Sequence, residues 1–177
     1  MNIFALDESP ILAAQYHTDK HVVKMIVETA QMLSTAHRLK GNEEQINNEH
    51  IYKKAYPNHP CTVWIREKSE NYLWAYRLFE SLLQEYKYRY GKDHSSVKLV
   101  PYLSMLPAKI SIGSRTPFAQ AMPDYCKSAD SITAYRQYYF IEKGHLFKWT
   151  KRNVPEWISP ESPNFLRREA TNLTTIV

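Results

Sequence analysis

Apolar positions recur at helical spacing along the first forty residues of this chain. Ser9 followed by Pro10 favours a helix start, because Ser caps a helix well and Pro suits the first helical position. The pattern then continues to about Leu39, and Gly41 is a natural stop. Thr18-Asp19 could restart a helix, so the stretch predicts either one bent helix or two.

A second long helix is expected after Asn58-His59-Pro60, where the apolar pattern resumes and continues until Gly91 ends it. Residues 42–58 are polar and predict a loop that contains at most a short helix.

A third helix is expected from Ser128 or Asp130 to Lys143, with Gly144 as its stop. Residues after about 169 are expected to fray. No hairpin signal or repeat occurs, so the chain predicts a mostly α fold: one domain over residues 1–177, with three main helices and long Pro-containing loops. Those loops are predicted around Pro101, Pro107, Pro117 and Pro123.

One polar stripe stands out within the first helical region. His17, His21, Lys24 and Glu28 recur at offsets that would align them along one ridge of a helix. Core-type residues border the ridge on both sides, whereas an ordinary amphipathic helix turns a broad polar face to water. The stripe therefore predicts a half-buried site.

Composition narrows the chemistry. Only four glycines occur, which excludes the clustered glycines of dinucleotide-binding and phosphate-cradling loops, and no cofactor is expected. Two cysteines give neither a disulfide framework nor a tetrahedral sulfur site. No apolar run approaches the roughly 18 residues that a membrane span needs, so a soluble cytoplasmic protein without a membrane partner is expected.

Charge and aromatic content point towards a polyanion. The formal net charge is +5, and aromatic residues make up 13% of the chain, led by thirteen tyrosines. Cations and aromatics alternate near the third helix, a pattern that suits a DNA backbone with a ring stacking beside a base, although a solvated basic face is the alternative. The candidates are Arg136, Lys148, Trp149, Lys151 and Arg152.

Three stretches of the chain resemble the pyrimidine-dimer DNA glycosylases of the endonuclease V type, known from a phage and with bacterial relatives. The first comprises Met1-Asn2-Ile3-Phe4 with the segments 12–17 and 19–24. The second is Asn58-His59-Pro60-Cys61-Thr62-Val63-Trp64, and the third is Gln120-Ala121-Met122-Pro123-Asp124 followed by 135–139.

The resemblance implies a compact helical fold, a monomer and a place in a bacterial host cell. It also implies binding to duplex DNA with a flipped nucleotide, whose glycosidic bond is cleaved by an amine. In that family the amine is the processed N-terminus, which would be Asn2 here. A carboxylate on the first helix assists, and His and Arg side chains hold phosphates.

Several residues could supply this chemistry. Glu28 is the preferred carboxylate because it shares the ridge with Lys24 and both histidines, and Asp19 would serve if the helix breaks at Thr18. Asn2 is larger than the residues that permit removal of the initiator methionine. Lys24, with apolar neighbours that would lower its pKa, is then an alternative nucleophile, although a simple Lys24–Glu28 helix pair is favoured.

Other polar residues suit contacts with phosphate. His59 is expected at a helix start, where backbone N–H groups attract anions, or else as a plain N-cap. Arg66 could add to that site, and Arg115 lies in a second candidate loop. His17 and His21 could contact phosphate or base, pair within a polar seam or, less in keeping with the pattern, begin a metal site.

Four functions therefore remain open: a glycosylase with or without abasic-site lyase activity, a non-catalytic DNA-binding protein of the same fold, a transferase that modifies an unusual base, and a metal nuclease.

Overall fold

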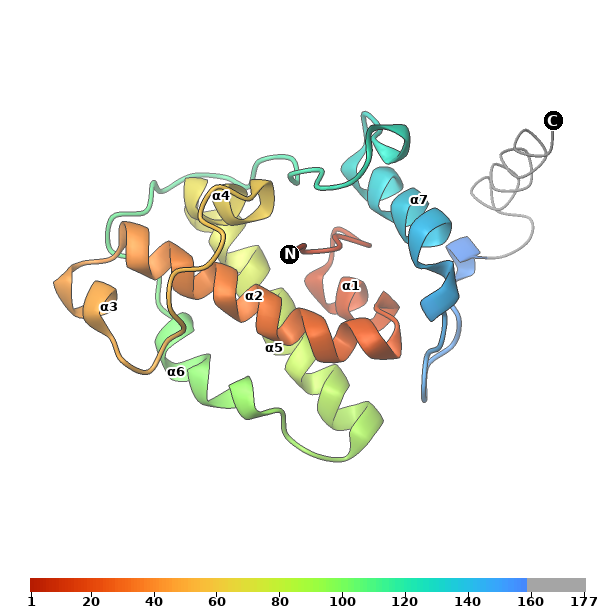
Figure 1. Cartoon of the computed structure of the whole chain (residues 1–177), viewed down its shortest axis with the longest axis horizontal. Coiled ribbons are helices and arrows are strands. Elements are labelled where there is room, and N and C mark those ends of the chain that lie inside the picture. Colours follow the sequence, from red (N-terminus) through yellow and green to blue (C-terminus); the bar gives the residue numbers. More distant parts are fainter. Residues whose placement is uncertain (159–177) are drawn as a thin grey trace.

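The computed structural model describes residues 1–158, and Figure 1 shows their arrangement. The predicted frayed tail after 169 lies outside the described residues. Helices and connecting loops make up the described part, which contains no strand. The prediction of a mostly α fold is confirmed.

The first helical region forms two helices, α1 (Pro10–Tyr16) and α2 (Asp19–Lys40). Ser9 caps α1 and accepts a hydrogen bond from the Leu12 N–H, as the Ser-Pro start predicts. The chain is extended at His17 and Thr18, and the Thr18 N–H bonds to the Tyr139 hydroxyl at 2.8 Å. His17 therefore lies outside α2, and the ridge begins at His21.

The second long helix is interrupted, contrary to the prediction of one continuous element. After the short α3 (Glu43–Asn47) come α4 (Pro60–Glu67) and α5 (Ser69–Tyr90), with Lys68 extended between them. The Ser69 N–H donates to the Ser111 carbonyl at 2.9 Å instead of to a carbonyl of α4. The apolar pattern continues across the break because α4 and α5 each bury an apolar face.

The proline-rich middle contains only short elements, as expected: a 3₁₀ turn (Ser95–Leu99), α6 (Val100–Leu103) and a further 3₁₀ turn (Asp124–Cys126). The third helix, α7, spans Ser131–Lys143, and Asp130 caps it by accepting from the Thr133 N–H at 2.7 Å. Two more 3₁₀ turns follow, Gly144–Leu146 and Glu156–Ile158.

The core lies where α2 packs against α5, which cross in Figure 1, and α1 and α4 pack beside them. Tyr72 of α5 is fully buried here, and its hydroxyl donates to the Leu103 carbonyl at 2.8 Å; Tyr135 and Tyr139 of α7 are fully buried as well. Part of the aromatic excess is therefore core. Among residues 1–158, no helix is long and apolar enough to cross a membrane.

Candidate active site at the amino terminus

The first residues of the chain meet Glu28 of α2. The Asn2 backbone N–H donates to Glu28 Oε2 at 3.0 Å, and the Met1 α-ammonium lies 3.5 Å from the same oxygen. Lys24 Nζ lies 3.4 Å from Oε1, which is the predicted i,i+4 pair. The Glu28 side chain is 14% exposed and that of Lys24 is 66% exposed. One half-buried carboxylate thus contacts an amine, an amide and a lysine.

Side-chain contacts fix this segment beside Glu28. Asn2 is buried, and its side-chain oxygen accepts the N–H groups of Ile3 and Phe4 at 2.8 and 3.1 Å. Its amide group donates to the Ala121 carbonyl at 2.8 Å, which ties the segment to the loop before α7. The side chain of Met1 is 4% exposed, and its sulfur accepts from Thr62 Oγ1 at 3.6 Å. The amine is therefore positioned by tertiary structure.

His59 lies at the edge of the same site. It is the N-cap of α4, and its Nδ1 accepts from the Cys61 N–H at 3.2 Å, so the capping interpretation is confirmed. Partial burial lowers the pKa of His59; the positive Met1 amine lowers it further, while Glu28 raises it. His59 is thus close enough to the amine and the carboxylate to sense both charges.

Lys24 does not have the apolar enclosure that its role as an alternative nucleophile requires. Its side chain is largely exposed and pairs with Glu28, an arrangement that matches the favoured helix-pair interpretation.

His17 and His21 pack against Phe4 of the amino-terminal segment. Phe4, held at a positive φ of 39°, stacks on His21 with ring centroids 4.6 Å apart. His21 Nδ1 bonds to the Tyr139 hydroxyl at 2.8 Å, and His17 Nδ1 bonds to the Ala13 carbonyl at 2.7 Å. Burial lowers the pKa of His17 to about 4 and that of His21 to about 3. Both rings are therefore neutral near pH 7, which matches the polar-seam interpretation better than phosphate binding by imidazolium.

Lys24, Lys143 and His145 lie near this seam. The charges of Lys143, Lys24 and His145 contribute, after burial and the neighbouring His17, to the lowered pKa of His21. Lys143 Nζ also lies 4.9 Å from the centroid of the Tyr138 ring. The charges of these two lysines near His21 would favour the approach of an anion.

Asp19 is engaged elsewhere. Its Oδ1 lies 3.0 Å from Arg89 Nη1, and it accepts from the Thr150 N–H at 2.9 Å and the Thr150 hydroxyl at 2.6 Å. Burial alone would raise the pKa of Asp19, but the hydrogen bonds from Thr150 and the Arg89 guanidinium hold it below its ordinary value. Arg89 also binds Glu85, so Asp19 belongs to a buried ion network that joins α2, α5 and the segment after α7.

Three predicted DNA-contacting arginines make contacts within the protein. Arg136 donates to the Leu6 carbonyl at 2.8 Å and pairs with Asp7 at 3.0 Å. Arg66 Nη1 donates to the Pro57 carbonyl at 2.5 Å. Arg115 pairs with Glu8, and its guanidinium lies 4.4 Å from the Phe118 ring centroid. These contacts hold loops around the site, and a role in DNA contact stays a prediction.

The predicted cationic track after α7 is not continuous. Lys148 is exposed, whereas Trp149 is buried and donates through its indole to the Tyr16 carbonyl at 2.9 Å. Arg152 pairs with Glu85 at 2.5 Å, and Lys151 Nζ donates to the Tyr88 carbonyl at 2.9 Å. Buried in this way, Trp149 offers no free face to a base, and the role of this segment in DNA contact stays a prediction.

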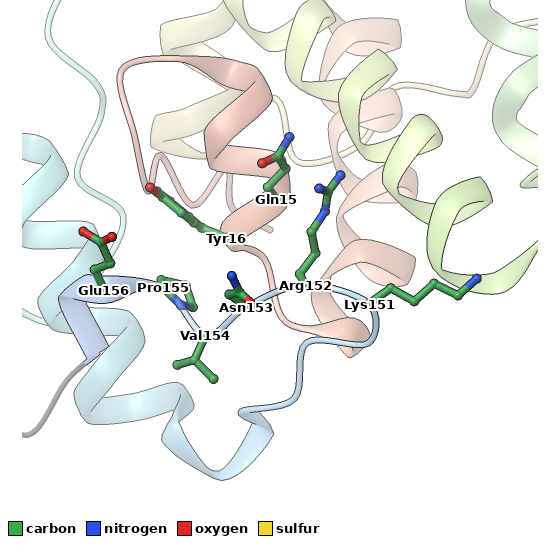
Figure 2. A pocket seen from close by; sticks show the side chains of 8 residues that line it. All are labelled: Gln15, Tyr16, Lys151, Arg152, Asn153, Val154, Pro155 and Glu156. Atoms are coloured by element: carbon green, nitrogen blue, oxygen red, sulfur yellow. The ribbon is translucent and has the colours of Figure 1, made fainter.

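Lys151 and Arg152 line a pocket of about 390 Å³ between the end of α1 and the segment 151–156 (Figure 2). Gln15 and Tyr16 line the pocket from the end of α1, and the Lys151 side chain extends away from it in Figure 2. Glu28, Thr62 and Ala121, which contact Met1 and Asn2, do not line this pocket.

Nothing in the described part of the chain gathers three or more His, Cys, Asp or Glu side chains into a possible metal site. His17 and His21 each use one ring nitrogen in a hydrogen bond within the protein.

The sequence predicts no role for two residues of the site. Thr62 donates a hydrogen bond to the Met1 sulfur, and the Ala121 carbonyl accepts one from the Asn2 side-chain amide. Both fall within stretches that carry the family resemblance. A backbone carbonyl and a hydroxyl–thioether contact leave no periodic signal, so only the resemblance could have indicated them.

Comparison with known proteins shows which family the chain belongs to. Residues 1–99, which include the amino terminus, Glu28 and His59, match the pyrimidine dimer DNA glycosylase family. This chain belongs to that family. No curated protein and no solved structure matches it.

Proposed function

We propose that this protein is a DNA glycosylase that acts on a pyrimidine lesion in duplex DNA through an α-amino nucleophile assisted by Glu28. The observation that carries the proposal is the contact of one half-buried carboxylate with both the Met1 amine and the Asn2 nitrogen. Family membership supports the substrate class. The cationic groups beside the site suit a phosphate backbone.

The chemistry follows from an amine beside a carboxylate. The neutral amine attacks C1′ of a flipped-out pyrimidine nucleotide, and a C1′–N bond to the amine forms. The C1′–N1 glycosidic bond breaks, and its electron pair leaves with the base, which takes up a proton. Opening of the sugar ring then gives an imine between C1′ and the amine. Loss of a C2′ proton expels the 3′ phosphate, and water releases the enzyme.

Glu28 has two roles in this scheme. It accepts the ammonium proton, so that the amine is nucleophilic, and its negative charge stabilises the cation that develops at the sugar. Its position on the long, well-packed α2 keeps the carboxylate in place while the amine moves towards C1′. Lys24, at the exposed side of Glu28, is suited to hold a phosphate.

The proposal accommodates either state of the amino terminus. With Met1 present, the nucleophile is the Met1 amine, 3.5 Å from Glu28. If Met1 is removed, the nitrogen that becomes the amine is that of Asn2, 3.0 Å from the same oxygen. The size of Asn2 favours retention of Met1, and both nitrogens remain within reach of the carboxylate.

The first test is a cleavage assay on a duplex that carries one cyclobutane thymine dimer, with wild-type protein and Glu28→Gln. We expect the wild type to cleave a glycosidic bond of the dimer and Glu28→Gln to lose the activity while it still binds the duplex. Equal cleavage by both proteins would contradict the role of Glu28. Binding without cleavage by the wild type would favour the second candidate, a non-catalytic DNA-binding protein. Because many cations are paired within the protein, exposed lysines would then have to provide the DNA contacts.

A further inference from the structure

The loop that leads into α4, residues 52–59, has a firmly held backbone. Thr35 of α2 accepts the Ala55 N–H at 3.0 Å and donates to the Ala55 carbonyl at 3.2 Å. Arg66 holds the Pro57 carbonyl, and the His59 N–H donates to the Tyr56 carbonyl at 3.1 Å. Contacts therefore fix the chain on both sides of Tyr56.

The side chain of Tyr56 is free by contrast. It is 70% exposed, and among residues 1–158 it makes no hydrogen bond, ion pair or ring contact. Its backbone has a positive φ of 43°, a conformation that Gly or Asn adopts more easily than a bulky aromatic residue. The turn alone would thus be better served by another residue, and strain of this kind is concentrated at functional positions.

The residues next to Tyr56 in the loop are suited to contact a nucleic acid. Lys53 and Lys54 are exposed and precede Tyr56 in the same loop. Three residues further on is His59, whose pKa responds to the charges of the Met1 amine and Glu28. An aromatic ring next to cations is the combination with which proteins stack on unpaired bases, and the backbone of Tyr56 bonds to His59 at the edge of the candidate active site.

We propose that Tyr56 is a base-stacking residue: its ring packs against a base exposed when a nucleotide at the lesion leaves the helix, and Lys53 and Lys54 contact the flanking phosphates. The inference rests on the proposed function, since it takes damaged duplex DNA as the ligand. The fixed backbone means that little loop entropy is lost when the ring stacks. The ring fills space that an extruded nucleotide vacates, which favours the flipped state.

The test measures binding with a Glu28→Gln background, so that it does not depend on catalysis. Tyr56→Phe, Tyr56→Gly and the Glu28→Gln parent are titrated with a duplex that carries a thymine dimer and with the same duplex undamaged. Base stacking predicts that Tyr56→Gly weakens binding to the damaged duplex by roughly 5- to 150-fold. Tyr56→Phe keeps the ring and stays within about twofold of the parent. Affinity for the undamaged duplex changes little in either variant.

Thermal unfolding separates stacking from a structural role. Gly relieves the positive φ, so Tyr56→Gly should unfold at the same temperature as the parent or higher. 2-Aminopurine placed beside the dimer reports base extrusion directly, and its fluorescence increase on binding should be smaller for Tyr56→Gly. Parent-like affinity and fluorescence in a folded Tyr56→Gly would overturn the inference. Failure of wild-type cleavage with a normal Tyr56 effect on binding would overturn the catalytic proposal alone.

The two lysines are tested separately. The paired change Lys53→Gln and Lys54→Gln should weaken binding to damaged and undamaged duplexes alike. It should also lower the salt dependence of binding by about one unit of slope for each phosphate that a lysine no longer neutralises. An unchanged slope would remove the lysines from the DNA-binding surface.

Discussion

The backbone nitrogen of Asn2 donates to Glu28 Oε2 at 3.0 Å, across 26 positions of the sequence. This contact joins the start of the chain to the middle of α2. It brings together the two groups that an amine-dependent glycosylase requires, a nitrogen that can become nucleophilic and a carboxylate that can take its proton.

Glu28→Gln removes the proton acceptor but preserves shape. We expect a loss of turnover of roughly 10²–10⁴-fold, the usual contribution of a general acid–base group. A single-turnover cleavage assay on dimer-containing DNA measures the effect. The exposed Glu44→Gln on α3 is the matched control and should cleave at the wild-type rate.

Lys24→Ala tests whether the lysine is the nucleophile. Because Lys24 is 66% exposed and paired with Glu28, we expect a loss in DNA affinity of several-fold at low salt and continued formation of a covalent intermediate. Gel-shift titrations at two salt concentrations measure the affinity. Abolition of chemistry with unchanged binding would instead identify Lys24 as the reacting amine.

The buried ion network should be important for stability. The Arg89 side chain is fully buried between Asp19 and Glu85, so Arg89→Met leaves Asp19 without its charged partner and Glu85 with Arg152 alone. We expect a loss of about 3–5 kcal/mol in the free energy of unfolding, measured by urea titration. The exposed Arg77→Met on the same helix should change it by less than about 0.5 kcal/mol. Comparable losses would argue against the network.

Stability should fall as the solution becomes acidic. The pKa of His17 is lowered to about 4 and that of His21 to about 3, from an ordinary 6.5, mainly by burial. Below pH 6.5 the unfolded chain therefore binds protons that the folded chain does not, and each histidine contributes a slope of up to about 1.4 kcal/mol per pH unit. Urea titrations from pH 7 to 4.5 measure this slope. His21→Phe keeps a ring against Phe4 and should remove one histidine's contribution from the slope of stability against pH. An unchanged slope would show that His21 is protonated in the folded protein.

The sequence alone predicts much of this structure, for reasons that differ between elements. Pro10, Gly41 and Gly91 mark helix ends through local backbone preferences, so those boundaries were predictable. The break at Lys68 was not, because it depends on a hydrogen bond from Ser69 to the distant Ser111 carbonyl.

The same distinction applies to the site. Glu28 was identified by a polar ridge with apolar borders, which is a local pattern. His17 falls outside α2 because Thr18 bonds to Tyr139, a contact between distant segments that periodicity does not encode. The exposed Tyr56 gives no sequence signal either, since its significance comes from a positive φ and a firmly held loop.

The central claim is most directly tested by borohydride trapping on a duplex that carries a thymine dimer, followed by digestion and mass mapping of the adduct. The account predicts a covalent protein–DNA adduct on the α-amino group of the first residue of the purified chain, and its loss in Glu28→Gln. An adduct on Lys24, or dimer cleavage without any trapped adduct, would contradict the account.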